Sequence, residues 1–513
     1  MAAEEIITDK TIGHVYQNYA TSRPWTDLRA HEIRRELKQV SWVTSQSYFS
    51  QFFYPTCSTL RDQTFTSAGT RLLSNVPNTA ILHPCPSPSA LLVSCMSLCP
   101  SLLEEPSYPQ DIKEKARRIL EATEQFSIGS YTDTSGLRIV REHVARFITK
   151  RDGYTADPDS IILTSGGASG IKIALDALST GYFCSDEDRA GLMTPIPCFF
   201  HYPTWIKRLN LYQIPYYLDE DNDWALDIRE LERALNESRP HCRPRGLVLI
   251  NPGNPTGQVL SYDNIKEVIK FCAREKLVLF ADEVYQETVF TNEVQFHSCK
   301  KVLRDLGPEY NKFQLMSINS ASKGFYGECG LRGAYIELVG FSKEVLFQVK
   351  RYCSPPCTVP SSIAQAAVSA ICNPPQPGDE SYETFIKEKM AILDSYQRKA
   401  KITTKMLNSL KDVSCNPVTG SLYAFPKVIL PQKAVEEAKL KNCAPDEFYC
   451  WQMLEATGIS PVPGNSFGQK DGTYHFRLTI LPSEEKVVSM FDRMSKFHEE
   501  FMQKYRNDKD NQH

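Results

Sequence analysis

The spacing of apolar residues predicts alternating helices and strands over most of the chain. Between 137 and 150, Leu137, Val140, Val144 and Ile148 recur every three to four residues, which is typical of an amphipathic helix. Weaker helical patterns cover 111–123, 170–178 and 263–275. Short apolar runs predict strands at 160–164, 192–196, 246–250, 277–280 and 313–318. Because these runs are unbroken and alternate with helices, they indicate an α/β fold whose mostly parallel sheet is covered on both faces.

A proline-rich segment at 373–379 marks a candidate domain boundary. Beyond it the pattern predicts long helices over 382–410, strands at 420–425 and 474–480, and a last helix that begins at Ser483. This order is typical of a smaller α+β domain. We therefore expect a large domain at 108–375 and a small C-terminal domain at 376–513, to which an N-terminal segment at 1–107 contributes.

One window departs from the rest of the chain. Residues 41–100 hold only three charged residues, with 18 Ser and Thr and six Pro. Neither a period of 2 nor one of 3.6 is visible there, so we expect irregular structure. The preceding stretch, 14–39, has a partly helical pattern.

Composition narrows the classes of function. The 513 residues include 58 basic and 61 acidic ones, giving a net charge of −3, whereas a general nucleic-acid binder needs a basic face. No apolar run reaches the ~18 residues that a membrane span requires. The acidic start, Met1–Lys10, lacks a targeting pattern, so the 16 scattered Cys are expected to be reduced thiols in the cytoplasm. Neither Cys95/Cys99 nor Cys353/Cys357 has the neighbours of a zinc site, and we expect no metal.

Four motifs follow predicted strands, and the carboxyl ends of parallel strands form a ligand crevice. The first, Ser165-Gly-Gly-Ala-Ser169, precedes a helix and suits a phosphate, although a tight turn with an N-cap would look the same. The second, Asn251-Pro-Gly-Asn-Pro-Thr-Gly257, predicts a rigid loop that directs an Asn amide into the crevice, with a solvent turn as the alternative.

The other two motifs carry charge. Asp282 directly follows an apolar strand, where a buried carboxylate needs a positively charged partner. That partner is a protonated ring nitrogen or, with a merely structural role, an Arg or a helix N-terminus. In the segment 320–332, Lys323 lies between hydroxyls with Arg332 nine residues on, which suits an amine nucleophile beside an anion. A Walker-type loop is the rival, but its spacing is absent. Together the four motifs fit pyridoxal phosphate.

From about 101 to 504 the chain resembles the alanine aminotransferases of the fold-type I pyridoxal-phosphate family. The resemblance rests on N-P-G-N-P-T-G at 251–257, D-E-V-Y-Q at 282–286 and S-A-S-K-G-F-Y-G-E-C-G-L-R at 320–332. It implies a class I/II aminotransferase that uses pyridoxal 5'-phosphate, acts on amino acids and 2-oxo acids, and forms a homodimer.

The resemblance also implies roles for particular residues. Lys323 would bind the cofactor covalently and move the proton of the reaction, and Asp282 would pair with the ring nitrogen. Tyr285 and Asn254 would bind the 3-oxygen, and Arg477 would clamp the substrate carboxylate. Asn254 would also contribute to substrate binding. The phosphate would be held by Ala168, Ser169, Ser320, Ser322, Arg332 and, from the other subunit, Tyr131.

Two departures from the family pattern stand out. The family's P-x-P-Q-Y-P-L-Y loop reads Pro195-Ile-Pro-Cys-Phe-Phe-His-Tyr202 here, so Phe199 takes the place of the aromatic residue that stacks on the ring. The G-N-P turn that contributes to the substrate pocket is missing from 41–100. The resemblance thus implies transfer of the amino group from L-alanine to 2-oxoglutarate. The alternatives are another pair, such as glutamate with glyoxylate or another small amino acid, or a catalytically silent homologue with a binding role.

Overall fold

The computed structural model describes residues 88–179, 188–352 and 359–506. The helical pattern at 14–39 and most of the 41–100 window lie outside the described residues. Among the described helices, none combines the length and the apolar character needed to cross a membrane.

A seven-stranded sheet forms the centre, with the strand order β1-β7-β6-β5-β4-β2-β3. All neighbouring pairs are parallel except those of β7, which runs antiparallel to both β1 and β6. The predicted strands are present, but β3 and β7 were not predicted. The bounds are β1 Ile161–Ser165, β2 Ala190–Ile196, β3 Tyr212–Tyr217, β4 Arg243–Ile250, β5 Val278–Asp282, β6 Leu315–Ser320 and β7 Gly333–Val339.

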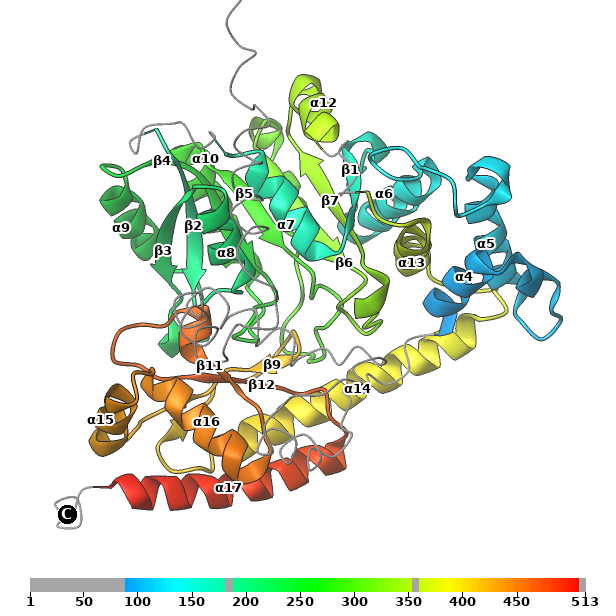
Figure 1. Ribbon diagram of the computed structural model, residues 1–513. Coiled ribbons are helices and arrows are strands. Elements are labelled where there is room, and N and C mark those ends of the chain that lie inside the picture. The colour runs from blue at the N-terminus through cyan, green and yellow to red at the C-terminus, as the bar shows by residue number, and fades with distance from the viewer. Residues whose placement is uncertain (1–87, 180–187, 353–358, 507–513) are drawn as a thin grey trace, which may run out of the picture. The chain divides into compact units, whose positions relative to one another are not determined.

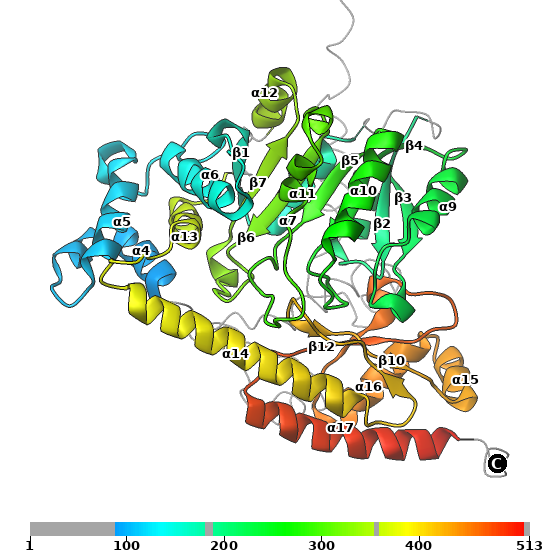
Figure 2. The same cartoon turned by 180° about the vertical axis from the view of Figure 1, so that it is seen from behind.

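Helices cover both faces of this sheet, as the apolar strands predict (Figure 1). One face packs against α7 (Gly167–Asp176), α8 (His201–Arg208) and α12 (Lys343–Tyr352). The other face packs against α9 (Ile228–Ser238), α10 (Tyr262–Glu275) and α11 (Cys299–Asp305), which lie in front in Figure 2. Near the β1–β7 end, α6 (Arg138–Asp152) and α13 (Ser362–Cys372) pack on each other.

The expectation of irregular structure throughout 41–100 was wrong at its end, where Pro88–Leu98 forms helix α4. This helix packs against α5 (Gln110–Glu121) and α13, with Val93 and Met96 fully buried. Ser94 and Ser97 are buried as well, and the Ser97 hydroxyl donates to the carbonyl of Val93 at 2.8 Å. Because small and apolar residues occupy several sides of α4, its sequence carries no amphipathic period.

The C-terminal part begins with α14 (Tyr382–Leu407), one long helix that packs on α17 (Glu484–Tyr505) (Figure 2). Ser483 is the N-cap of α17, as predicted. The remaining elements are α15 Gln432–Leu440, α16 Pro445–Thr457, the antiparallel pair β8 Val413–Ser414 and β10 Lys427–Val428, and the antiparallel sheet β11 Val462–Pro463, β12 Phe476–Thr479 and β9 Tyr423–Ala424.

A backbone contact brings this small sheet to the large one. The N–H of Gly420, just before β9, donates to the carbonyl of Gly257 at 2.9 Å. Gly257 ends the loop that follows β4, and its φ of +77° is in the left-handed region that favours glycine. Residues of β9 and β12 are thereby placed beside the carboxyl edge of the large sheet.

Candidate functional site

The carboxyl ends of β1, β4, β5 and β6 lie at one edge of the sheet. All four strands are parallel, because β7 is antiparallel to both β1 and β6. The four motifs follow these four ends, at Ser165, Ile250, Asp282 and Ser320. The prediction that the motifs converge is therefore confirmed.

The first motif forms a glycine cradle at the N-terminus of α7, with Ala168 and Ser169 in the first turn. Gly166 has a φ of +83°, and a Cβ there would lie 2.1 Å from a guanidinium nitrogen of Arg332. A Cβ on Gly167 would lie 3.8 Å from the Cβ of Ser320. The N-terminus of α7, with its partial positive charge, thus lies beside the fully charged guanidinium group of Arg332. This arrangement suits a phosphate.

Hydroxyl groups line the same place. The Ser169 hydroxyl donates to the carbonyl of Ser165 at 3.0 Å, so it must turn away from that carbonyl before it can donate to a phosphate. Ser320 donates to the carbonyl of Gly333 at 3.2 Å. The Ser322 hydroxyl is buried and has no hydrogen-bond partner within the described parts of the chain. A buried unpaired hydroxyl is costly, and a bound anion would satisfy it.

Asp282 ends β5 with its side chain 3% exposed. Tyr202, on α8, donates its hydroxyl hydrogen to Oδ2 at 3.0 Å. Oδ1 has no partner of good hydrogen-bond geometry among the residues that the structure describes. Burial raises the pKa of Asp282 to about 6, against the opposing effects of the Tyr202 hydroxyl, the backbone N–H of Val284 and the charge of Lys323. The carboxyl group therefore awaits a hydrogen-bond donor, and a cationic one would return its pKa to the acidic range.

Glu283 follows Asp282 in the chain, and its side chain anchors this turn on the opposite side of the sheet. It is fully buried, and its carboxylate accepts hydrogen bonds from the N–H of Cys299 and the hydroxyl of Ser317, both at 2.7 Å. Because buried charges are costly to move, this anchoring holds the segment 282–285 in one position.

Lys323 lies in the turn after β6, beside two tyrosines. Its Nζ is 5.7 Å from the centre of the Tyr285 ring. Tyr285, 1% exposed, donates its hydroxyl hydrogen to the hydroxyl of Tyr423 at 3.1 Å. Tyr423, on β9, also shares a hydrogen bond with Lys323. Burial opposes the ionisation of Tyr423, but the charges of Lys323 and Arg477 lower its pKa to about 8.

Arg477, on β12 of the small sheet, contacts Asn254 in the loop that follows β4 of the large sheet. The guanidinium group donates to Oδ1 of Asn254 at 3.0 Å. Its central carbon lies 4.2 Å from the centre of the Tyr423 ring and 4.8 Å from that of Phe467. Two aromatic faces and one amide thus hold a guanidinium group whose remaining donors suit a carboxylate.

The loop that departs from the family pattern contributes two stacked rings. Phe199 and His201 lie 4.6 Å apart, with an angle of 18° between their planes. Burial lowers the pKa of His201 to about 4, assisted by the cations of Arg332 and Lys323. His201 is therefore neutral at physiological pH and adds no charge to the site. Stacking of Phe199 on a bound ring stays a prediction.

Tyr131 is the one expected site residue that lies apart. Its side chain is fully exposed, at 101% of the reference area, in the loop before α6. Its expected role belongs to a neighbouring subunit, and this position leaves the side chain accessible to one.

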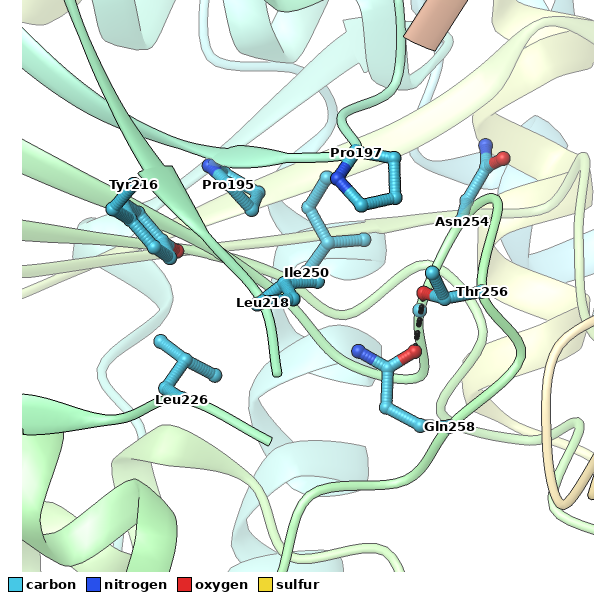
Figure 3. Close-up of a pocket in the computed structure, with 10 residues that line it drawn as sticks. Pro195, Pro197, Tyr216, Leu218, Leu226, Ile250, Asn254, Thr256 and Gln258 are labelled. Carbon is cyan, nitrogen blue, oxygen red and sulfur yellow. Dashed lines mark hydrogen bonds between the residues drawn. The ribbon is translucent and has the colours of Figure 1, made fainter. Parts of the chain in front are cut away.

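A hollow lies beside the 251–257 loop (Figure 3), and neither Lys323 nor Asp282 is among the residues that line it. Figure 3 shows Asn254 at its rim, while Thr256 and Gln258 hydrogen-bond to each other on the loop. Its walls are mainly apolar, formed by Pro195, Pro197, Tyr216, Leu218, Leu226 and Ile250. In the described residues, no three His, Cys, Asp or Glu side chains are arranged to hold a metal ion.

Two residues of the site were not predicted from the sequence. Tyr202 lies on α8, at the end of the segment 195–202 that was noted only for its altered aromatic residue. Tyr423 lies in the predicted strand at 420–425, with no motif around it. Neither could be found without the fold, since their partners Asp282 and Lys323 are far away in the sequence.

The model of the family "Aminotransferase class I and II" matches residues 98–493. "Alanine aminotransferase 2-like" of Danio rerio is 47% identical over 414 residues, which are 80% of this chain and 75% of that protein. "Alanine aminotransferase 1" of Homo sapiens is 44% identical over 422 residues, 82% of this chain and 84% of that protein.

Solved structures show the same fold. An alanine aminotransferase from Pyrococcus furiosus superposes with a TM-score of 0.63 at 20% identity, over 81% of this chain and 89% of that one. A tyrosine aminotransferase from Leishmania infantum gives a TM-score of 0.65 at 17% identity, over 86% of this chain and 100% of that one. At such low identity these likenesses concern the fold alone.

Proposed function

The chain belongs to the class I and II aminotransferase family, and from this premise we propose that it is an alanine aminotransferase. It transfers the amino group of L-alanine to 2-oxoglutarate, giving pyruvate and L-glutamate. The observation that carries the proposal is the hydrogen bond between Arg477 and Asn254, close to Tyr423 and Lys323. The chain is also 44% identical to the human protein named alanine aminotransferase 1.

The family implies pyridoxal phosphate as the cofactor, and the residues present fit it. Oδ1 of Asp282 lacks a donor that the protonated ring nitrogen would supply. The hydroxyl of Ser322 lacks an acceptor that the phosphate would supply. Arg332 and the glycine cradle add the positive charge that a phosphate requires. When bound, the cofactor supplies an electron sink that stabilises negative charge at the substrate Cα.

The chain's own residues supply binding, orientation and proton transfer. Arg477 and Asn254 hold the substrate carboxylate, so the Cα lies near Nζ of Lys323. The amine of Lys323 would act as the general base that takes the Cα proton and as the general acid that gives it back. Asp282, whose ionised form is favoured by the hydrogen bond from Tyr202, would pair with the ring nitrogen of the bound cofactor.

The active form is a homodimer in this proposal. Tyr131, exposed on one subunit, reaches the phosphate site of the other and donates its hydroxyl hydrogen there. The exposure of this large aromatic side chain supports the proposal, since such side chains are enriched at interfaces between subunits. A cytoplasmic location stays a prediction, and one relative, from Dictyostelium discoideum, is named as mitochondrial.

A panel of amino donors tests the proposal. The purified protein, loaded with pyridoxal phosphate, is given alanine, glutamate, aspartate, serine and glycine in turn, with 2-oxoglutarate or glyoxylate as acceptor. We expect the highest kcat/KM for alanine with 2-oxoglutarate. A preference for glutamate with glyoxylate would replace the proposal by the second substrate pair. Bound cofactor without turnover of any donor would replace it by a binding role.

A further inference from the structure

Tyr423 lies between Arg477, proposed to bind the substrate, and Lys323, proposed to transfer the proton. Its hydroxyl accepts the hydrogen of Tyr285 at 3.1 Å and shares a hydrogen bond with Lys323. The face of its ring lies 4.2 Å from the guanidinium carbon of Arg477. One side chain thus contacts the residue proposed for proton transfer, the residue proposed for the 3-oxygen, and the residue proposed for the substrate carboxylate.

The position of Tyr423 in the fold makes these contacts a link between two parts of the chain. Tyr423 is on β9 and pairs with Thr479 of β12, the strand that carries Arg477. Tyr285 and Lys323 follow β5 and β6 of the large sheet. Gly420, three residues before Tyr423, is bonded to Gly257 of the large part. The hydroxyl of Tyr423 therefore extends from the small sheet to the reacting edge of the large one.

The two functions of this side chain reside in different atoms. The ring lies under the planar guanidinium group and limits its rotation, which leaves the edge of the guanidinium group free for a carboxylate. The hydroxyl lies between a donor, Tyr285, and a cation, Lys323. An oxygen so placed stabilises the amino group of Lys323 whenever that group is free of the cofactor.

We propose that Tyr423 is a positioning residue with two separable roles: its ring orients Arg477 toward the substrate carboxylate, and its hydroxyl holds the amino group of Lys323 in place for proton transfer. This inference rests on the proposed function, because it assigns Lys323 and Arg477 the roles stated there. It adds a residue that connects substrate binding with the proton-transfer step.

The first test uses the cofactor-free protein and needs no activity. Ionisation of tyrosine is followed by ultraviolet difference absorbance during a pH titration of the wild type and of Tyr423→Phe. Because the cations of Lys323 and Arg477 lower the pKa of Tyr423, the wild type should show a one-tyrosine transition near pH 8 that Tyr423→Phe lacks. Tyr505→Phe, at a buried position on α17, is the matched control and should keep the transition. Identical titrations of wild type and Tyr423→Phe would overturn the placement of the hydroxyl.

The second test separates ring from hydroxyl in the loaded enzyme. Tyr423→Phe keeps the stacking surface and loses only the hydroxyl, so kcat should fall about tenfold while KM for both substrates stays within about twofold. Tyr423→Leu loses the ring as well, so KM should also rise about tenfold. Equal kinetic changes in both variants, or wild-type kinetics in both, would overturn the two-role proposal.

The two tests distinguish failure of this inference from failure of the proposed function. An inactive wild type would contradict alanine transamination, while the titration would still decide whether Tyr423 lies between the two cations. An active wild type whose titration lacks the transition would keep the function and remove the inference.

Discussion

Tyr202 donates its hydroxyl hydrogen to Oδ2 of Asp282 at 3.0 Å, while Oδ1 of the same carboxylate has no partner of good geometry in the described residues. One oxygen of this buried carboxyl group is therefore held by the Tyr202 hydroxyl, and the other is buried without such a partner. The hydrogen bond from Tyr202 orients the carboxylate of Asp282 and favours its ionised form.

The first prediction concerns that hydrogen bond. Tyr202→Phe removes a donor that lowers the pKa of Asp282, so that pKa should rise further. A hydrogen bond of this kind is worth about 0.5–1.5 kcal/mol, which corresponds to a shift of up to about one pH unit. The acidic limb of the kcat/KM profile should move upward by about that amount. A profile that superimposes on the wild type would show that Tyr202 does not control the ionisation of Asp282.

The second prediction separates stability from activity at Asp282. Burial raises the folded-state pKa to about 6, so the folded protein binds this proton more tightly than the unfolded chain does. The resulting contribution to stability is present below about pH 4 and is lost as the pH rises through about 6. In the cofactor-free protein at pH 8, Asp282→Asn should therefore raise the free energy of unfolding by up to about 3 kcal/mol.

That gain should shrink to below about 1 kcal/mol near pH 4, where the carboxyl group is neutral in the folded protein and about half ionised in the unfolded chain. In the loaded enzyme the same variant should lose at least about a hundredfold in kcat, because an amide does not hold the ring nitrogen protonated. Thermal unfolding of the cofactor-free protein at the two pH values, with kinetics alongside, is the measurement. A cofactor-free variant that is less stable than the wild type at pH 8 would contradict the account of Asp282.

The third prediction concerns Arg477. Arg477→Lys keeps the charge but loses the planar pair of donors, so the carboxylate is held by a point charge and the bond to Asn254 is altered. A lost charge-assisted hydrogen bond costs about 1.5–3 kcal/mol, and kcat/KM for both substrates should fall by about 10- to 100-fold. Arg398→Lys, at an exposed ion pair with Glu484, is the control and should leave kcat/KM unchanged. Loss of activity with only one of the two substrates would argue against a shared carboxylate site.

The fourth prediction concerns Tyr131. Lys323→Ala and Tyr131→Ala subunits are produced together with two different affinity tags, and the mixed dimers are isolated. If Tyr131 serves the neighbouring subunit, both lesions fall in one site and the other site is intact, so mixed dimers should have about half the activity of the wild type. If Tyr131 serves its own subunit, each site carries one lesion and the mixed dimers should be inactive.

The sequence predicted the edge of the sheet where chemistry takes place because the motifs there are local. Gly166, Asp282 and Lys323 each follow a strand within a few residues, and apolar strands are visible as short unbroken runs. The alternation of strands and helices then places all of them on one side. Asn254 and Arg477, each expected to bind the substrate, also hydrogen-bond to each other, although 223 positions separate them in the sequence.

Tyr423, α4 and β7 could not be predicted, because contacts between segments far apart in the sequence determine them. Tyr423 has no local motif, and its role follows from β9 lying beside β12 and from the Gly420–Gly257 contact. Helix α4 was missed because it is apolar on several sides and packs between α5 and α13, which removes the period that marks a surface helix. β7 was missed although all its residues are buried, because it lies between two antiparallel neighbours that only the fold supplies.

The central claim is that Lys323 carries out alanine transamination at this site, and the formation of pyruvate tests it most directly. The purified protein, loaded with pyridoxal phosphate, is mixed with L-alanine and 2-oxoglutarate, and pyruvate is followed by a coupled dehydrogenase. We predict that pyruvate appears together with an equal amount of glutamate, that omission of either substrate stops it, and that Lys323→Ala abolishes it. A wild-type protein that binds the cofactor and forms no pyruvate, or a Lys323→Ala variant that forms it at the wild-type rate, would contradict the account.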